Sequence, residues 1–364
     1  MKNIFQQTAF FSIVMLSLAW SEPSDEMISH GSQPQLSVDN KGVVRLVFGR
    51  SDSIFCSTSV NEGVNFSKPV FVGHITSMHL GMSRGPQIAS SNKYSLITAI
   101  DKSGNIHYFK LTHSSGKWAY KGLLNDIKSS APEGLMSIAS DAQDKFYAVW
   151  LDIRQGNKNN ICFSALSGTE EKWGGNALIY ISPDEHVCEC CKPSIAVKGS
   201  KVAIMYRNWL NGSRDLYVKA SENGGGTFKE AQKLGIGTWK LNGCPMDGGG
   251  IAIDNTGHIT TTWQREGIVY YCKLNESETT LLKGRACSIT LNKTNNNKTF
   301  ITMQDGGNVK IMDLGDKKEF VVGKGSFLKS LMLPDENIIC SWEQDNNIKF
   351  KKVTLQSMNS VFVN

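Results

Sequence analysis

The feature that most constrains the fold is a unit of four short strands that recurs along the chain. Each unit opens with an apolar strand, often after a proline, as in residues 34–38, 86–89 and 193–197. A turn, a second strand, a polar loop, a third strand and an edge strand follow. Units begin near residues 34, 86, 135, 193, 247, 287 and 329.

Short alternating strands at this period are typical of a propeller, in which each unit is one blade. We therefore predict an all-β chain that folds as a single β-propeller of four-stranded blades. Seven blades are favoured, and six are the alternative if the two end segments share a blade.

The N-terminal residues have the pattern of a secretory signal peptide. Lys2 precedes an apolar run at residues 8–20, and the small residues Ala19 and Ser21 suit a cleavage site. The run is short for a membrane span. We predict a signal peptide at residues 1–21 and a propeller at residues 22–364. The protein is then secreted or periplasmic, with no stable membrane insertion after cleavage.

The charge pattern does not indicate a nucleic-acid partner. The formal net charge is +6, but the basic residues are scattered, with no run longer than two. Nucleic-acid-binding domains gather such residues in a patch or stripe. We therefore expect no nucleic acid among the partners, and no motif indicates a cofactor.

Two units carry the same turn motif between their third and fourth strands. Residues 221–228 (SENGGGTF) and 59–66 (SVNEGVNF) both fit S-x-[DN]-x-G-x-[TN]-[WF]. In such a turn the Asn side chain binds local backbone N–H groups, and Gly accepts a positive φ. We expect the terminal aromatic residue to pack between two sheets.

These motifs resemble the Asp-boxes of the sialidase (BNR-repeat) propeller superfamily, and the resemblance covers residues 34–355. Residues 188–193 (CECCKP), 206–215 and 237–249 (GTWKLNGCPMDGG) further resemble bacterial secreted sialidase-like proteins with CECC and CPMDGG motifs. The resemblance implies an acidic sugar ligand, because sialidases bind a sugar carboxylate with three arginines. It also implies a late tyrosine nucleophile. Here the last tyrosines are Tyr270 and Tyr271.

Seven of the eight arginines fall in loops that the repeat places at one end of the propeller. A guanidinium is a planar fork that suits carboxylate or phosphate. We predict that this end binds an acidic glycan or similar anion. The predicted ligand-binding residues are Arg84, Arg154, Arg207, Asp215, Trp239 and Arg265. In the alternative interpretation, the arginines form structural salt bridges with Asp152, Asp215 and Glu266.

Three residues at the same end are candidates for catalysis. Asp247 precedes three glycines that leave it room, and Glu189 lies in another inter-blade loop. Tyr206, or alternatively Tyr270, would have to replace the missing late tyrosine. The alternative for Asp247 is a turn-forming carboxylate that caps backbone amides.

The cysteines divide into a cluster and five isolated residues. Cys56, Cys162, Cys272, Cys287 and Cys340 lie in or at the start of apolar strands, so we predict buried thiols. Three interpretations are open for the cluster. Cys244 pairs with Cys188, Cys190 or Cys191 in a disulfide; the four cysteines bind a soft metal with Met246 and His186; or one is a redox-active thiol.

The sequence therefore predicts an exported sialidase-like propeller that binds an acidic glycan. If it is an enzyme, it is an exo-glycosidase of the sialidase type. The alternatives are a non-catalytic propeller that binds glycans or proteins, and a periplasmic propeller that binds a soft metal through its Cys, Met and His residues.

Overall fold

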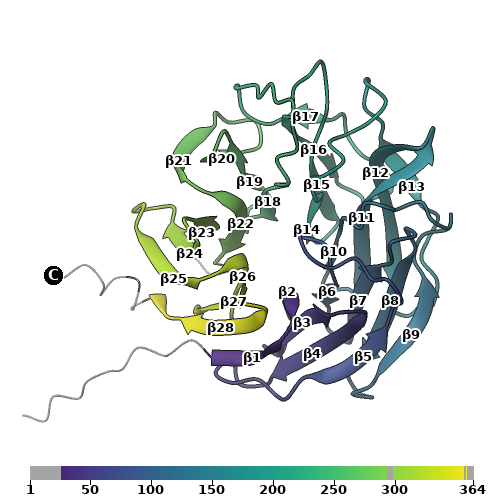
Figure 1. Cartoon of the computed structure of the whole chain (residues 1–364), viewed down its shortest axis with the longest axis vertical. Helices are drawn as coiled ribbons and strands as arrows, with labels where there is room; N and C mark the ends of the chain where they lie inside the picture. The colour runs from purple at the N-terminus through teal and green to yellow at the C-terminus, as the bar shows by residue number, and fades with distance from the viewer. Residues whose placement is uncertain (1–25, 293–297, 356–357, 359–364) are drawn as a thin grey trace, which may run out of the picture.

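The computed structural model describes residues 26–292, 298–355 and 358. These residues form seven four-stranded sheets arranged as blades around a central axis, as Figure 1 shows. The all-β propeller prediction and the favoured count of seven blades are confirmed. The predicted signal peptide, residues 1–21, lies outside the described residues. Among the described residues, no helix has the length and apolar character to cross a membrane.

Every blade is an antiparallel sheet whose strands follow one another from the axis outward. Blade one contains β2 (Ser32–Val38), β3 (Val44–Arg50), β4 (Ser53–Ser59) and β5 (Val70–His74). Blade two contains β6 (Gln87–Ser90), β7 (Tyr94–Ile100), β8 (Ile106–Thr112) and β9 (Trp118–Leu123). Blade three contains β10 (Met136–Ser140), β11 (Lys145–Gln155), β12 (Lys158–Ser167) and β13 (Ala177–Tyr180). Blade four contains β14 (Ser194–Lys198), β15 (Lys201–Arg207), β16 (Leu216–Ser221) and β17 (Gln232–Lys233).

The last three blades follow the same order. Blade five contains β18 (Gly250–Ile253), β19 (Ile259–Arg265), β20 (Ile268–Lys273) and β21 (Thr279–Lys283). Blade six contains β22 (Arg285–Leu291), β23 (Thr299–Asp305), β24 (Asn308–Asp313) and β25 (Glu319–Lys324). Blade seven contains β26 (Ser326–Met332), β27 (Ile338–Gln344), β28 (Asn347–Val353) and, from the start of the chain, β1 (Glu26–His30).

Blade seven closes the ring. Strand β1 pairs with β28, with Glu26 opposite Phe350 and His30 opposite Asn347. The end segments therefore do share a blade, yet the count stays at seven because β1 precedes the first complete unit. This pairing joins the two ends of the chain and covers the edge of β28, which would otherwise be open.

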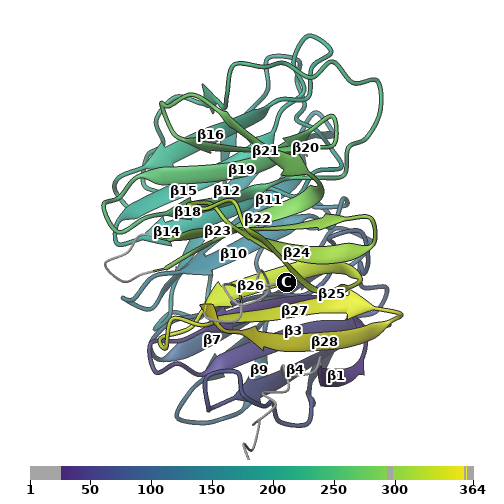
Figure 2. The ribbon, with the colours of Figure 1, turned by 90° about the vertical axis from the view of Figure 1, so that its left-hand side faces the viewer.

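The core lies between neighbouring blades. Apolar side chains on facing sheets bury Trp150 between blades two and three, and Tyr206 between blades three and four. The first strands of neighbouring blades contact one another around the whole ring, for example β14 with β18, β18 with β22 and β22 with β26. Figure 2 shows the ring turned by 90°, with blades five to seven toward the viewer. The first strand of each blade therefore lines the axis, and the fourth lies at the rim.

The two turn motifs have the predicted geometry. In the first, Asn61 Oδ1 accepts the N–H of Asn65 at 3.2 Å, the N–H of Gly63 donates to the Ser59 hydroxyl at 2.9 Å, and Phe66 packs edge-on against Phe350 of blade seven. In the second, Asn223 Oδ1 accepts the N–H of Thr227 at 2.9 Å, and the N–H of Gly225 donates to the Ser221 hydroxyl at 3.0 Å. Phe228 there packs against Phe163 of blade three. Each aromatic residue therefore plugs the space between two blades.

Candidate functional site

A cavity of about 290 Å³ lies on the propeller axis, at the end where the inner strands begin. Each inner strand contributes one residue from the same position in its blade. These residues are Gln35, Gln87, Ser137, Ser194, Gly250, Ser288 and Lys329. Four of these seven residues are small, namely Ser137, Ser194, Gly250 and Ser288. The axis therefore stays open at this level.

Two lysines meet in this cavity. Lys329 is the charged member of the ring, and Lys192 enters from the loop before β14. The Lys192 ammonium donates a hydrogen bond to the Gln87 side chain of blade two, across the axis. Among the described residues, the Lys329 ammonium has no hydrogen-bond or ion-pair partner. Burial lowers the pKa of Lys192 well below its usual value, and the charge of Lys329 lowers it further.

Asp247 is the one carboxyl group among the described residues that line this cavity. Its Oδ2 accepts the N–H of Ala286 at 2.8 Å. Its Oδ1 is buried and has no hydrogen-bond partner among the described residues. Burial raises the pKa of Asp247, while the Ala286 N–H and the charge of Arg207 oppose that shift. The residue thus caps one backbone amide, as the turn interpretation predicts, and keeps one oxygen available.

Gly248 explains how Asp247 reaches the axis. A Cβ at this position would lie 1.8 Å from the carbonyl oxygen of Lys192. Only glycine lets the loop of residues 234–249 pass so close to the loop that carries Lys192. The glycines after Asp247 therefore make room at the entrance of blade five, as the sequence indicated.

Arg207 lies behind this wall, and only 1 % of its surface is exposed. Its guanidinium donates to the backbone carbonyls of Arg214 at 2.7 Å, Asp247 at 3.0 and 3.1 Å, and Gln264 at 3.1 Å. The Trp239 ring lies 5.3 Å from it. Arg207 therefore holds the backbone of Asp247 in place and points its donors at the protein.

The other three arginines proposed as ligand-binding residues are held by carboxylates. Arg84 pairs with Glu133 at 3.3 Å. Arg154 pairs with Asp152 at 2.8 Å, as the salt-bridge interpretation expected, and also with Asp126 at 3.0 Å. Arg265 pairs with Glu278 at 2.5 Å, where the same interpretation expected Glu266. Glu133 and Asp126 lie far from their arginines in the sequence, whereas Asp152 and Glu278 lie nearby. The structure does not bring these arginines into the axial cavity.

The remaining sequence candidates also lie outside the cavity. Tyr206 is fully buried against Tyr180 in the core between blades three and four. Asp215 accepts the backbone N–H of Trp239 at 2.8 Å and pairs with Lys233 at 3.2 Å. Glu189 is exposed and lies 3.8 Å from the His186 ring. Because Tyr206 is buried in this core, its hydroxyl cannot contact a ligand, and Tyr206 is not part of the proposed site.

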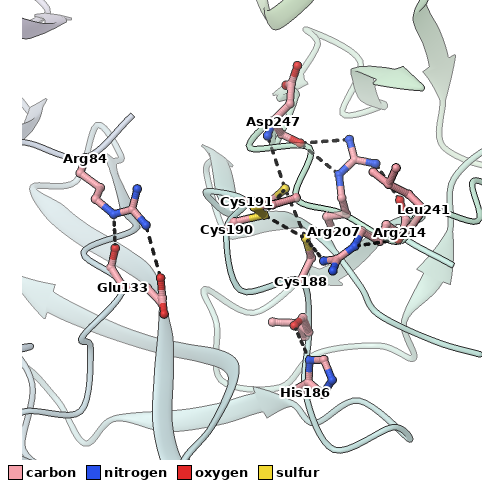
Figure 3. Close-up of a disulfide and its surroundings, with 12 residues drawn as sticks. Arg84, Glu133, His186, Cys188, Cys190, Cys191, Arg207, Arg214, Leu241 and Asp247 are labelled. Carbon is pink, nitrogen blue, oxygen red and sulfur yellow. Dashed lines mark hydrogen bonds and ion pairs between the residues drawn. A yellow bond between two sulfur atoms is a disulfide. The ribbon is translucent and has the colours of Figure 1, made fainter. Parts of the chain in front are cut away.

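Four sulfur atoms gather beside the cavity. Cys190 and Cys244 form a disulfide, which confirms the pairing of Cys244 with the CECC segment. The Cys188 and Cys191 thiols are buried beneath it, with their Sγ atoms 3.4 Å apart. Figure 3 shows the Asp247 carboxylate pointing away from these sulfurs, while its backbone N–H donates to Cys191 at 3.4 Å.

The pKa values of the two free thiols of this cluster are shifted in opposite directions. Hydrogen bonding to Cys191 and the charges of Arg214 and Arg207 lower the pKa of Cys188 to about 6. Burial raises the pKa of Cys191 well above its usual value. Arg214 Nη1 lies 2.9 Å from Cys188 Sγ. Cys188 is therefore the more acidic thiol of the pair.

The structure does not assemble the full donor set of the metal interpretation. Cys188, Cys190 and Cys191 lie close enough to share an ion, but Cys190 is already bonded to Cys244. His186 stacks on Trp209 with ring centroids 5.9 Å apart. Met246 lines the axial cavity. The five isolated cysteines are all buried, as predicted: Cys56, Cys162, Cys272, Cys287 and Cys340.

Sequence reasoning missed both lysines of the cavity. Lys192 lies in the CECCKP segment and Lys329 at the start of the seventh unit. The signal for Lys329 lay in the repeat itself. Gln35, Gln87 and Ser194 each follow a proline in the first strand, and extending that alignment to the seventh unit places Lys329 among them.

Comparisons with known proteins identify the fold. No family model and no curated protein matches the sequence. Solved structures do match. The BP39L lectin from Burkholderia pseudomallei has a TM-score of 0.61 at 10% identity, covering 90% of this chain and 100% of the lectin. The fold is that of a β-propeller.

Two further structures resemble this propeller over almost its whole length. An ulvan lyase of polysaccharide lyase family PL25, solved with -[GlcA(1-4)Rha3S]-, has a TM-score of 0.57 at 9% identity and covers 92% of this chain and 99% of its own. Virginiamycin B lyase from Staphylococcus aureus has a TM-score of 0.55 at 10% identity, with coverage of 91% and 99%. Identities this low establish the architecture alone.

Proposed function

We propose that this propeller is exported and binds an acidic glycan in its axial cavity, with Lys192 and Lys329 holding a carboxylate or sulfate group. The observation that carries the proposal is the charge balance of the cavity. Two lysines line this cavity together with a single carboxyl group, Asp247. Two half-buried ammonium groups that repel each other are costly, and a bound anion relieves that cost.

The chemical class of the ligand follows from the same geometry. Lysine is a compact charge that pairs with carboxylate, sulfate or phosphate. The cavity is also lined by the Gln35 amide, which suits a sugar hydroxyl. Among the structures with this fold are a lectin and a lyase solved with a saccharide that carries both an acid and a sulfate. These neighbours support a glycan over another anion.

Binding is favoured over catalysis because the cavity holds a single carboxyl group and no tyrosine among the described residues. The second candidate function, an exo-glycosidase, rests on Asp247. Its raised pKa and free Oδ1 suit a proton donor. Hydrolysis of a fluorogenic sialoside or uronide that collapses in Asp247→Asn would support this function, and no turnover with folded protein would exclude it for those sugars.

The binding proposal is tested by calorimetry with the purified chain. The panel pairs sialylated, uronic-acid and sulfated oligosaccharides with neutral analogues of the same length. We expect binding of at least one acidic sugar and none of its neutral partner. Lys329→Gln and Lys192→Gln should each weaken it by about tenfold or more, as loss of a charge-assisted contact does.

Lys324→Gln is the matched control, because Lys324 ends the outer strand β25 and is exposed. It should bind like the unmodified chain. Equal affinity for acidic and neutral sugars, or unchanged affinity in both cavity variants, would overturn the proposal.

A further inference from the structure

The four clustered sulfurs combine a dithiol with a disulfide at contact distance. Cys188 and Cys191 are the two ends of a C-x-x-C segment, and Cys190 lies between them in the sequence. Cys188 Sγ is 3.4 Å from Cys191 Sγ and 3.7 Å from Cys190 Sγ. Cys190 is bonded to Cys244 of the next inter-blade loop. A thiol in contact with a disulfide sulfur is the arrangement that thiol–disulfide exchange requires.

We propose that Cys188, Cys190, Cys191 and Cys244 form an exchange centre that moves a disulfide between a buried and an exposed pair. Cys188 attacks Cys190 Sγ. The Cys188–Cys190 bond forms, the Cys190–Cys244 bond breaks, and the electron pair leaves with Cys244, which takes up a proton from water. Cys191 then loses its proton and attacks Cys188 Sγ. The Cys188–Cys191 bond forms, and Cys190 leaves and is protonated.

The electron balance of this sequence closes within the molecule. Two thiols, Cys188 and Cys191, are oxidised, and one disulfide, Cys190–Cys244, is reduced. The step needs no outside oxidant or reductant. Its product is a buried disulfide and a pair of thiols, Cys190 and Cys244, in the surface loops.

Exposure gives the exchange a direction. Cys188 and Cys191 have 0% and 1% of their surfaces exposed, whereas Cys244 is an exposed residue. An outside molecule therefore reaches the Cys190–Cys244 pair and not the dithiol. The substrate class is an accessible disulfide of a small molecule or another protein, which the surface thiols reduce while they return to the disulfide.

The surroundings select Cys188 as the attacking sulfur. Arg214 Nη1 contacts Cys188 Sγ at 2.9 Å, and the same guanidinium lies over the Trp209 ring at 4.6 Å. The stacked ring and the Leu241 carbonyl, at 3.3 Å from Arg214 Nε, hold the cation in place. A fixed cation at a sulfur stabilises its thiolate and opposes a metal ion there. This contact favours exchange over the soft-metal interpretation.

The test uses the full chain, purified without reductant, and the chromogenic disulfide DTNB. We expect a fast release of about two thionitrobenzoate equivalents per chain, since each disulfide reduced by a dithiol releases two thiols. Peptide mapping after an acid quench and alkylation should then find both Cys190–Cys244 and a new Cys188–Cys191 disulfide.

Three variants separate the steps. Cys188→Ser should abolish the fast phase while Cys190–Cys244 persists. Cys191→Ser should stop at Cys188–Cys190 and release about one equivalent, from Cys244. Arg214→Gln should slow the fast phase by about tenfold and leave its amplitude unchanged. Cys340→Ser, a buried core thiol far from the cluster, is the matched control and should behave like the unmodified chain. Circular dichroism checks that each variant is folded.

Three results would overturn the proposal. One is a fast phase that survives in Cys188→Ser. Another is a reacted chain in which Cys188 and Cys191 are still thiols. The last is a zinc or copper ion bound per purified chain, with DTNB reactivity that appears only after chelation, which would establish the metal site instead.

Discussion

The two sides of the propeller mouth are built differently. Blades three, four and five are joined by long loops, residues 181–193 and 234–249, whereas blades five, six and seven are joined by Gly284 and Gly325 alone. The long loops carry the disulfide, both cluster thiols, Lys192 and Asp247. The short side contributes one charged group to the cavity, Lys329, and that group comes from a strand.

This difference shows where chemistry enters a symmetric fold. The one-residue connections are glycines, which have no side chain that could enter the cavity. The connections between blades five, six and seven therefore have only a structural role. The long loops carry side chains that can enter the cavity, but they need contacts within the protein that fix their position on the axis. Arg207 and Gly248 are those supports. The comparison predicts that substitutions of equal size cost more stability on the long-loop side.

The largest effect is expected at Arg207. Replacing it with Met removes the donors to three backbone carbonyls that stay buried, and each unpaired buried acceptor is costly. We expect a loss of about 3 kcal/mol or more in the free energy of unfolding, measured by urea denaturation. Arg285→Met, an exposed residue at the start of β22 on the short side, should change it by less than about 0.5 kcal/mol.

Equal losses in the two arginine variants would remove the distinction between the sides. The prediction also bears on ligand assays. An Arg207 variant could lose binding because the loop is displaced rather than because a ligand contact is lost. The lysine variants are therefore the direct test of binding.

A smaller effect is expected at Gly248. Alanine there places a methyl group 1.8 Å from the Lys192 carbonyl oxygen, so the two loops must separate. Overpacking of this kind costs about 2–3 kcal/mol. Gly243→Ala, in the same loop, meets its nearest neighbour at 3.7 Å and should be close to neutral. Thermal unfolding of both variants measures the difference, and similar melting temperatures would show that the loops adjust freely.

The repeat and the local turns could be predicted from the sequence because their causes are local. Alternating strands mark the blades, and the Ser59 and Ser221 turns are completed by hydrogen bonds within a few residues. The pairing of Cys244 with the CECC segment was also within reach, because the order of blades makes their loops neighbours.

The candidate site could be predicted only in part, for a physical reason. Asp247 was found because its glycines mark a close approach. Asp152 could be expected as a partner of Arg154, but Asp126 and Glu278 could not, because the fold brings them to Arg154 and Arg265. The importance of Lys329 could not be predicted, because it depends on the other six inner strands placing no charged side chain in the ring.

The smallest expected effect is at Lys329, on the short side, and it has a pH signature. Burial lowers the pKa of Lys329 below its ordinary value near 10.5, so the folded chain binds fewer protons there than the unfolded chain. Stability then rises with pH between the lowered pKa and about 10.5. Lys329→Met removes this penalty, so we expect a gain on the order of 1 kcal/mol near neutral pH and a flatter profile toward alkaline pH.

Urea denaturation from about pH 7 to about pH 10 measures this profile. Lys324→Met, at an exposed position, should run parallel to the unmodified chain. A parallel profile for Lys329→Met as well would mean that the cavity solvates its lysine fully, and the charge argument for an anion site would fail with it. If the profile flattens while acidic-glycan binding is lost, the chain keeps a destabilising charge on its axis because the ligand requires it.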